Sequence, residues 1–201
     1  MNSSMNMPQN FNAERKSGTV LFCDIRNFTH LFEEKDPLKA VAFANSVLAE
    51  LGTVVERGGG TVDRFTGDGF LAHFGVIQED NSHIDSACKV AIEMRAALQE
   101  INAKRYMDVE NVVTIGVGIH SGEVAYGEIK TEQINQKTVL GDVVNTAARI
   151  ERLTKYFSVD ILLSDSSYEH VADSFNFQKM PARKLRGKKN KVITHWLLPM
   201  N

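Results

Sequence analysis

Two aspartates stand where their side chains could take part in chemistry. Asp24 ends the apolar run 20–23, which predicts a buried strand. Asp68 lies in the segment "TGDG" between two short apolar runs, and this pattern predicts a hairpin. Each also has an ordinary explanation, because Asp24 can face water or cap the next segment and Gly-Asp-Gly is a common turn. If the first strand lies beside the hairpin, the two carboxylates converge at one sheet end and suit Mg²⁺.

The elements that must position these aspartates follow from the apolar periodicity. Asp36 is a plausible helix N-cap, Pro37 suits the first helical position and Gly58 is a plausible stop. The predicted order is a strand at 19–25, a helix at 36–60, a hairpin at 60–75, a helix at 81–103, two strands within 112–129 around "HSGE", a helix at 141–157, a strand at 159–165, a short helix at 165–172, and strands at 174–180 and 191–199. This order predicts an α+β fold of ferredoxin-like or palm-like plan, with helices packed on one face of an antiparallel sheet. We expect residues 1–17 to be a flexible leader or linker remnant and residues 18–201 to form one domain.

Composition excludes several classes of protein. The 201 residues are 43% hydrophobic with a formal net charge of -2, which indicates a packed globular chain without a global basic field for nucleic acid. Cys23 and Cys88 form no disulfide or metal-ligand pattern, which favours a reducing compartment. No apolar stretch approaches the length of a membrane span and no signal peptide is visible. We therefore expect a cytoplasmic location, or the cytoplasmic part of a larger protein, with no membrane contact by this segment.

Four segments in order resemble the catalytic domain of the class III nucleotide cyclases. They are "FCDIRNFT", "RFTGDGFLAHFG", "VGIHSGEVAYG" and "TVLGDVVNTAARIE", and the resemblance runs from about Gly18 to Trp196. It implies a head-to-tail homodimer with active sites at the interface between the two copies. It further implies that Asp24, Asp68 and Ile25 bind two Mg²⁺ or Mn²⁺ ions.

The same resemblance assigns contacts to the nucleotide. The segment 25–29, including Phe28 and Thr29, would contact the triphosphate through its backbone. Asn145 and Arg149, four residues apart on a predicted helix, project from one face. The resemblance implies that Asn145 orients the ribose and Arg149 steadies charge on the α-phosphate. The alternative for Arg149 is a surface ion pair with Glu151 or Glu50.

Base selection rests on two further positions. Arg64 stands where the family's adenine-selecting lysine lies, and Thr138 stands at the position of its adenine-selecting aspartate. Because arginine can only donate hydrogen bonds, Arg64 suits adenine N1, and Thr138 can accept from the adenine amino group. Threonine here resembles a subgroup that is often bicarbonate-responsive, so bicarbonate is a candidate regulator. The alternative is that Arg64 is an exposed hairpin residue and Thr138 an ordinary strand residue.

The remaining assignments concern phosphate contacts and the reaction. Lys191 is the first choice and Lys189 the second for a triphosphate contact from the basic tail, against the alternative of a solvated charge run. Gly116 stands where some family members place a phosphate-binding arginine, and His120 is expected to have a structural hydrogen-bonding role. The expected function is conversion of ATP to 3′,5′-cyclic AMP and pyrophosphate. The alternatives are a guanylyl cyclase and a non-catalytic dimerisation or nucleotide-sensing module.

Overall fold

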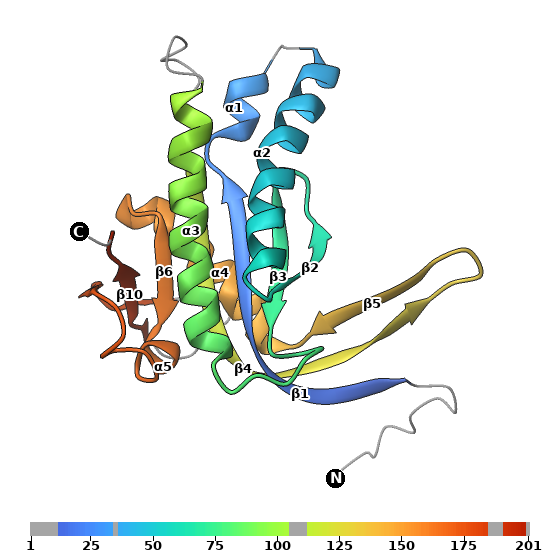
Figure 1. Cartoon of the computed structure of the whole chain (residues 1–201), viewed down its shortest axis with the longest axis vertical. Coiled ribbons are helices and arrows are strands. Elements are labelled where there is room, and N and C mark those ends of the chain that lie inside the picture. Colours follow the sequence, from blue (N-terminus) through green and yellow to red (C-terminus); the bar gives the residue numbers. More distant parts are fainter. Residues whose placement is uncertain (1–11, 34–35, 105–111, 185–190, 200–201) are drawn as a thin grey trace.

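The computed structural model describes residues 12–33, 36–104, 112–184 and 191–199 (Figure 1). Its main sheet has eight strands in the order β2-β3-β1-β4-β6-β10-β7, with β5 paired to β4, and β8 and β9 form a separate ribbon. The strands are β1 (Ala13–Ile25), β2 (Thr61–Phe65), β3 (Gly69–Phe74), β4 (Ile115–Lys130), β5 (Asn135–Leu140), β6 (Ile161–Ser164), β7 (Phe177–Lys179), β8 (Arg183–Lys184), β9 (Lys191–Val192) and β10 (Thr194–Leu197). Among the described strands only β4 and β6 pair in parallel, so the α+β class with a mainly antiparallel sheet is confirmed.

The two central strands are longer than the sequence pattern predicted. β1 pairs antiparallel with β4 along its whole length, from Ala13 opposite Gly127 to Ile25 opposite Ile115. Residues 13–17, predicted as leader, therefore belong to β1; their polar sequence reflects a largely exposed part of that strand. The predicted turn at "HSGE" was wrong, because His120 and its neighbours continue the ladder with β1. The turn comes later, where Thr131 N–H donates to the Ile134 carbonyl at 2.8 Å and reverses β4 into β5.

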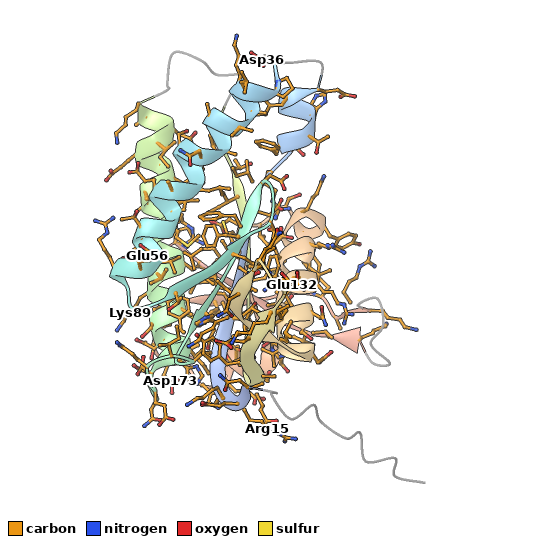
Figure 2. All side chains as sticks on the ribbon, turned by 90° about the vertical axis from the view of Figure 1, so that its right-hand side faces the viewer. Arg15, Asp36, Glu56, Lys89, Glu132 and Asp173 are labelled. Atoms are coloured by element: carbon orange, nitrogen blue, oxygen red, sulfur yellow. The ribbon has the colours of Figure 1, made fainter. Side chains whose placement is uncertain are left out.

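Four of the described helices begin within two residues of the predicted positions, whereas the short helix at 28–32 was not predicted and the one predicted at 165–172 ends earlier. The helices are α1 (Phe28–Phe32), α2 (Pro37–Arg57), α3 (His83–Ala103), α4 (Asp142–Phe157) and α5 (Asp165–Tyr168). Asp36 caps α2, since its carboxylate accepts from the Leu38 N–H at 3.0 Å, and Pro37 and Gly58 occupy the predicted ends. Figure 2 shows Asp36 at this end of the helix.

The helices cover both faces of the sheet, so the prediction of one covered face was wrong. Alternate residues of β1 separate the two faces. Leu21 and Cys23 pack in the largest core cluster with α2 and α3, whereas Val20 packs with Val143 and Val144 of α4. In Figure 1, α2 and α3 lie in front of the sheet and α4 behind it. The amphipathic pattern of α4 reveals that one side is buried, but it does not reveal on which side of the sheet.

By length and composition α2 could cross a membrane, contrary to the expectation from the sequence. It has 21 residues and a mean hydropathy of 1.4 over its most apolar window. Within this domain, Val47, Leu51 and Val55 of α2 are fully buried in the core cluster shared with α3 and the sheet. Packing in the core of this fold accounts for much of the apolar character of the helix.

Gly118 of β4 lies where α4 packs tightly against the sheet, so the stability of the domain should be sensitive to substitution at this position. A side chain at Gly118 would overlap the backbone of α4 at the Ala147 carbonyl and the Glu151 N–H. We expect Gly118→Ala to lower the free energy of unfolding by about 1–3 kcal/mol, because α4 must move away from β4. Urea denaturation followed by circular dichroism measures this.

Gly52→Ala is the matched control for that variant. A Cβ at Gly52, in the interior of α2, would meet the Val62 side chain at 3.6 Å, an ordinary contact. Alanine also has the higher helix propensity, so this variant should be as stable as the parent or more stable. A Gly118→Ala protein with unchanged stability would contradict the close packing of α4.

Candidate active site

Asp24 and Asp68 meet at one end of the sheet, as the sequence predicted. Asp24 stands opposite Gly69 in the β1–β3 ladder, and the Ile25 N–H donates to the Asp68 carbonyl at 2.9 Å. A side chain at Gly69 would overlap the Cys23 carbonyl oxygen, so the close approach of hairpin and strand requires glycine. Gly67 adopts a φ of 81° in the turn between β2 and β3, a conformation that glycine tolerates best.

The surroundings of Asp24 disfavour the ionised form of its carboxyl group. Burial, followed by the charge of Asp68, raises the pKa of Asp24 from 3.8 to about 6. Positive charges nearby lower this pKa, that of Arg26 most and those of Arg152 and Lys155 of α4 less. Two carboxylates that repel each other in a partly buried position favour a bound cation, which would relieve both burial and repulsion.

A buried ion pair lies beside this carboxylate pair. Arg26 Nη1 lies 3.6 Å from Glu151 Oε1, and both side chains are largely buried. Burial and the charge of Asp24 raise the pKa of Glu151 to about 7. A side chain at Gly116 would overlap the Arg26 guanidinium, so the absence of a side chain there makes room for this pair. The sequence reasoning missed Arg26, Glu151, Arg152 and Lys155, although Arg26 follows Asp24 by only two residues.

The donor set fits a hard divalent cation that retains other ligands. Within the described residues no group of three or more His, Cys, Asp or Glu side chains is arranged to hold a metal ion. Two carboxylates at a partly buried sheet end leave coordination positions for water and phosphate oxygens, which Mg²⁺ prefers over an all-protein cage. The residues therefore fit a divalent cation that takes its remaining ligands from water or from a phosphate group.

The segment 25–29 offers fewer backbone donors than predicted. The N–H groups of Ile25 and Arg26 are already used, by the carbonyls of Asp68 (2.9 Å) and Thr114 (2.8 Å). Phe28 and Thr29 lie in the first turn of α1, where a helix provides no carbonyl partner for its N–H groups. The backbone donors of this segment that remain for an anion are therefore those of Asn27, Phe28 and Thr29.

Arg64 and Thr138 are in direct contact, although they come from different strands. The Arg64 guanidinium donates to the Thr138 hydroxyl, which is buried with 1% of Thr138 exposed. Both also bind Asp63: Arg64 Nη1 and Thr138 Oγ1 each donate to Asp63 Oδ2 at 2.7 Å. The Val139 N–H donates to Asp63 Oδ1 at 3.0 Å. Sequence reasoning missed Asp63; the signal was an aspartate inside a predicted strand, where aspartate is disfavoured.

A β-bulge explains how two consecutive side chains reach one partner. Val62 pairs with Ala72 and Arg64 with Leu71, so Asp63 is the extra residue of β2. In a regular strand neighbouring side chains point to opposite faces, whereas a bulge redirects one of them. This bulge lets Asp63 and Arg64 both bond to Thr138.

Asn145 and Arg149 lie one turn apart on α4, as predicted. Asn145 is exposed and donates weakly to the Gly141 carbonyl at 3.3 Å. Arg149 is half-buried, and in the part of the chain that the structure describes it has no ion pair with Glu50 or Glu151. Glu151 instead pairs with Arg26, so the guanidinium of Arg149 is available to a ligand.

The tail residues are placed only in part. Lys191 is exposed in β9 opposite Lys184 of β8, and nearby the Arg183 guanidinium stacks on Tyr156 of α4 at 3.8 Å. Lys189 lies outside the described residues. His120 Nδ1 bonds to Ser164 Oγ at 2.8 Å, so the predicted hydrogen bond is confirmed.

An apolar hollow lies beside the aspartate end of the sheet. It has a volume of about 350 Å³ and is lined by residues of α2 together with Phe28, Phe65 and Gly67. Leu38, Val41 and Phe65 are more than half exposed at this part of the surface. Exposed apolar side chains gathered around a hollow are typical of a surface that another protein covers.

Comparison with known proteins places this arrangement in a family. The family described as "Adenylate and Guanylate cyclase catalytic domain" matches residues 12–199. An adenylate cyclase of Anabaena cylindrica is 34% identical over 183 residues, which cover 88% of this chain.

Two solved structures share the fold. The guanylyl cyclase Cya2 is 27% identical with a TM-score of 0.85, covering 94% of this chain and 95% of that one. The adenylyl cyclase CyaB of P. aeruginosa is 24% identical with a TM-score of 0.84, covering 94% and 97%, and at that identity shows the fold alone.

The relatives are longer proteins. The chain spans 36% of the Anabaena cyclase and 26% of adenylate cyclase 1 of Rhizobium meliloti. The family match nevertheless covers the sheet, the hairpin with Asp68 and the helix with Arg149. The chain therefore belongs to the adenylate and guanylate cyclase catalytic domain family.

Proposed function

We propose that this domain acts as an adenylyl cyclase in a homodimer. In the proposed reaction the ribose 3′-oxygen of ATP bonds to the α-phosphorus, and the bond from that phosphorus to the β-phosphate oxygen breaks. Cyclic AMP and pyrophosphate are the products, and the hydroxyl proton passes to water. The observation that carries the choice of ATP is the contact between Arg64 and Thr138, which places a donor beside an acceptor. That pattern complements adenine N1 and its amino group.

The other residues take complementary tasks. Asp24, Asp68 and the Ile25 carbonyl would hold two Mg²⁺ or Mn²⁺ ions, which when bound neutralise triphosphate charge and lower the pKa of the 3′-hydroxyl. Asn145 orients the ribose and Arg149 stabilises charge at the α-phosphate. The N–H groups of Phe28 and Thr29, together with Lys191, bind the triphosphate.

The homodimer is supported by the apolar hollow. Val41 and Phe65 expose apolar surface around this hollow, which Gly67 beside Asp68 also lines, so a second copy would cover the hollow together with the site. In a head-to-tail pair the aspartates of one copy would face Asn145 and Arg149 of the other. Bicarbonate activation and a cytoplasmic location remain predictions from the sequence.

The test of the activity is a product assay with ATP and GTP side by side, in Mg²⁺ and in Mn²⁺. We expect cyclic AMP as the main product, because Arg64 cannot accept from guanine N1–H. A guanylyl cyclase is the second candidate, since Cya2 is 27% identical. Predominant cyclic GMP would establish that candidate, and no product with either nucleotide would favour a non-catalytic module.

Removing either aspartate should separate activity from folding. We expect Asp24→Asn and Asp68→Asn each to lower turnover by at least about 100-fold. Asp24→Asn should melt at the same or a higher temperature at pH 7, because the raised pKa means that the ionised carboxylate destabilises the folded domain. Cyclase assays and thermal denaturation measure the two effects.

Asp80→Asn is the matched control. The Asp80 carboxylate accepts from Ser82 at the start of α3, and these hydrogen bonds lower its pKa. This variant should lose some stability and retain turnover. Full activity in either Asp24→Asn or Asp68→Asn would contradict the two-carboxylate site.

Mixing two inactive variants tests whether the site lies between copies. Asp24→Asn and Arg149→Ala should each be inactive as homodimers, since each lacks one side of both sites. Random exchange of equal amounts gives about half heterodimers with one intact site each, so about a quarter of the parental activity should return. Continued inactivity after subunit exchange, shown with differently tagged copies, would place the site within one chain.

A further inference from the structure

We propose that Asp63 is a positioning residue for base selection, which fixes the Thr138 hydroxyl as a hydrogen-bond acceptor toward the nucleotide base. The inference rests on the proposed function, in which Arg64 and Thr138 face the base. It adds a residue that makes no predicted contact with the nucleotide itself.

The Thr138 hydroxyl has one proton, and Asp63 takes it. A carboxylate can only accept, so the 2.7 Å bond between Thr138 Oγ1 and Asp63 Oδ2 uses the hydroxyl proton. A guanidinium can only donate, so the contact from Arg64 uses one of the two oxygen lone pairs. One lone pair remains, and the hydroxyl can offer only that lone pair to a ligand.

Asp63 is itself held in one orientation. Its side chain is 1% exposed, and the Val139 N–H donates to Oδ1 while Thr138 and Arg64 donate to Oδ2. His73 Nε2 lies 3.9 Å from Oδ1, beyond hydrogen-bond distance. Burial lowers the pKa of His73, so this ring is neutral at pH 7 and Arg64 is the cation that balances Asp63.

The base therefore meets one hydrogen-bond acceptor, at Thr138, and one set of donors, at Arg64. The fixed lone pair of Thr138 matches the adenine amino group and leaves guanine O6, an acceptor, without a donor. Arg64 uses Nη1 for Asp63 and Thr138, and its side chain remains 31% exposed with donors on Nε and Nη2 for adenine N1. Without Asp63, the hydroxyl could rotate and donate to guanine O6.

The experiment measures the discrimination between the two bases in Asp63→Asn. Asparagine keeps the shape and can donate to Thr138 Oγ1, which frees the hydroxyl proton. We expect the ratio of kcat/KM for ATP over GTP to fall on the order of 10-fold. Structural damage alone would lower both values together and leave the ratio unchanged, so an unchanged ratio would overturn the proposal.

Thr138 variants keep the test valid if Asp63→Asn folds poorly. Thr138→Ser retains the hydroxyl and should retain the preference, whereas Thr138→Val should lose it. In the Thr138→Val background, Asp63→Asn should change the ratio little further, because Asp63 acts on the base through that hydroxyl. Retained preference in Thr138→Val would overturn the proposal.

Asp160→Asn is the control for loss of a hydrogen-bonded carboxylate that is only partly buried. Asp160 pairs with Arg95 at 2.6 Å and accepts from Trp196, away from the base-recognition residues. It should lower stability without changing the ratio. A change as large as that of Asp63→Asn would count against a specific role.

Binding of non-hydrolysable ATP and GTP analogues separates this inference from the proposed activity. Adenine preference that falls in Asp63→Asn supports the role of Asp63 even if the parent shows no turnover, which would reject only the cyclase activity. Adenine preference unaffected by Asp63→Asn rejects the role of Asp63 and leaves the activity standing. Tighter binding of the GTP analogue by the parent chain would reject both.

Discussion

The register of β1 between β3 and β4 is the constraint on which the rest of the structure depends. It sets Asp24 opposite Gly69 and ties the Ile25 N–H to the Asp68 carbonyl. A slip of one residue would move Asp24 to the opposite face, toward the core beneath α2 and α3. Leu21 and Cys23 would then leave the core cluster that they form with α2 and α3, so the free energy of core packing maintains the geometry of the aspartates.

Near the end of β1 the fold brings together charged side chains that water would solvate in the unfolded chain. Asp24, Arg26 and Glu151 lie together at partly or largely buried positions, and burial raises the pKa of both carboxyl groups. Such a cluster adds little to stability by itself, because desolvation offsets attraction. Its excess of carboxylates would favour a bound cation, and the close packing of α4 against β4 holds Glu151 in place.

The features that local sequence encodes were predictable, and those that depend on distant chain segments were not. The strand end at Asp24, the turn at Asp68 and the capped start of α2 each follow from a few neighbouring residues. The continuity of β4 past His120 depends on β1, which supplies the pairing partner. The role of Asp63 depends on a bulge and on Thr138, 75 residues away, so strict alternation would have assigned its side chain to the wrong face.

The side-chain hydrogen bonds between β2 and β5 also attach the β4–β5 hairpin to the edge of the sheet. The β4–β5 hairpin, with Glu132 at its turn, projects from the sheet (Figures 1 and 2). Among the residues that the structure describes, β5 pairs along its backbone only with β4, and three hydrogen bonds centred on Asp63 and Thr138 join it to β2. Because these bonds share two side chains, loss of either the Asp63 or the Thr138 side chain would remove two of the three at once. The attachment of β5 to β2 therefore depends on both side chains together, in addition to the ladder that holds β4 against β1.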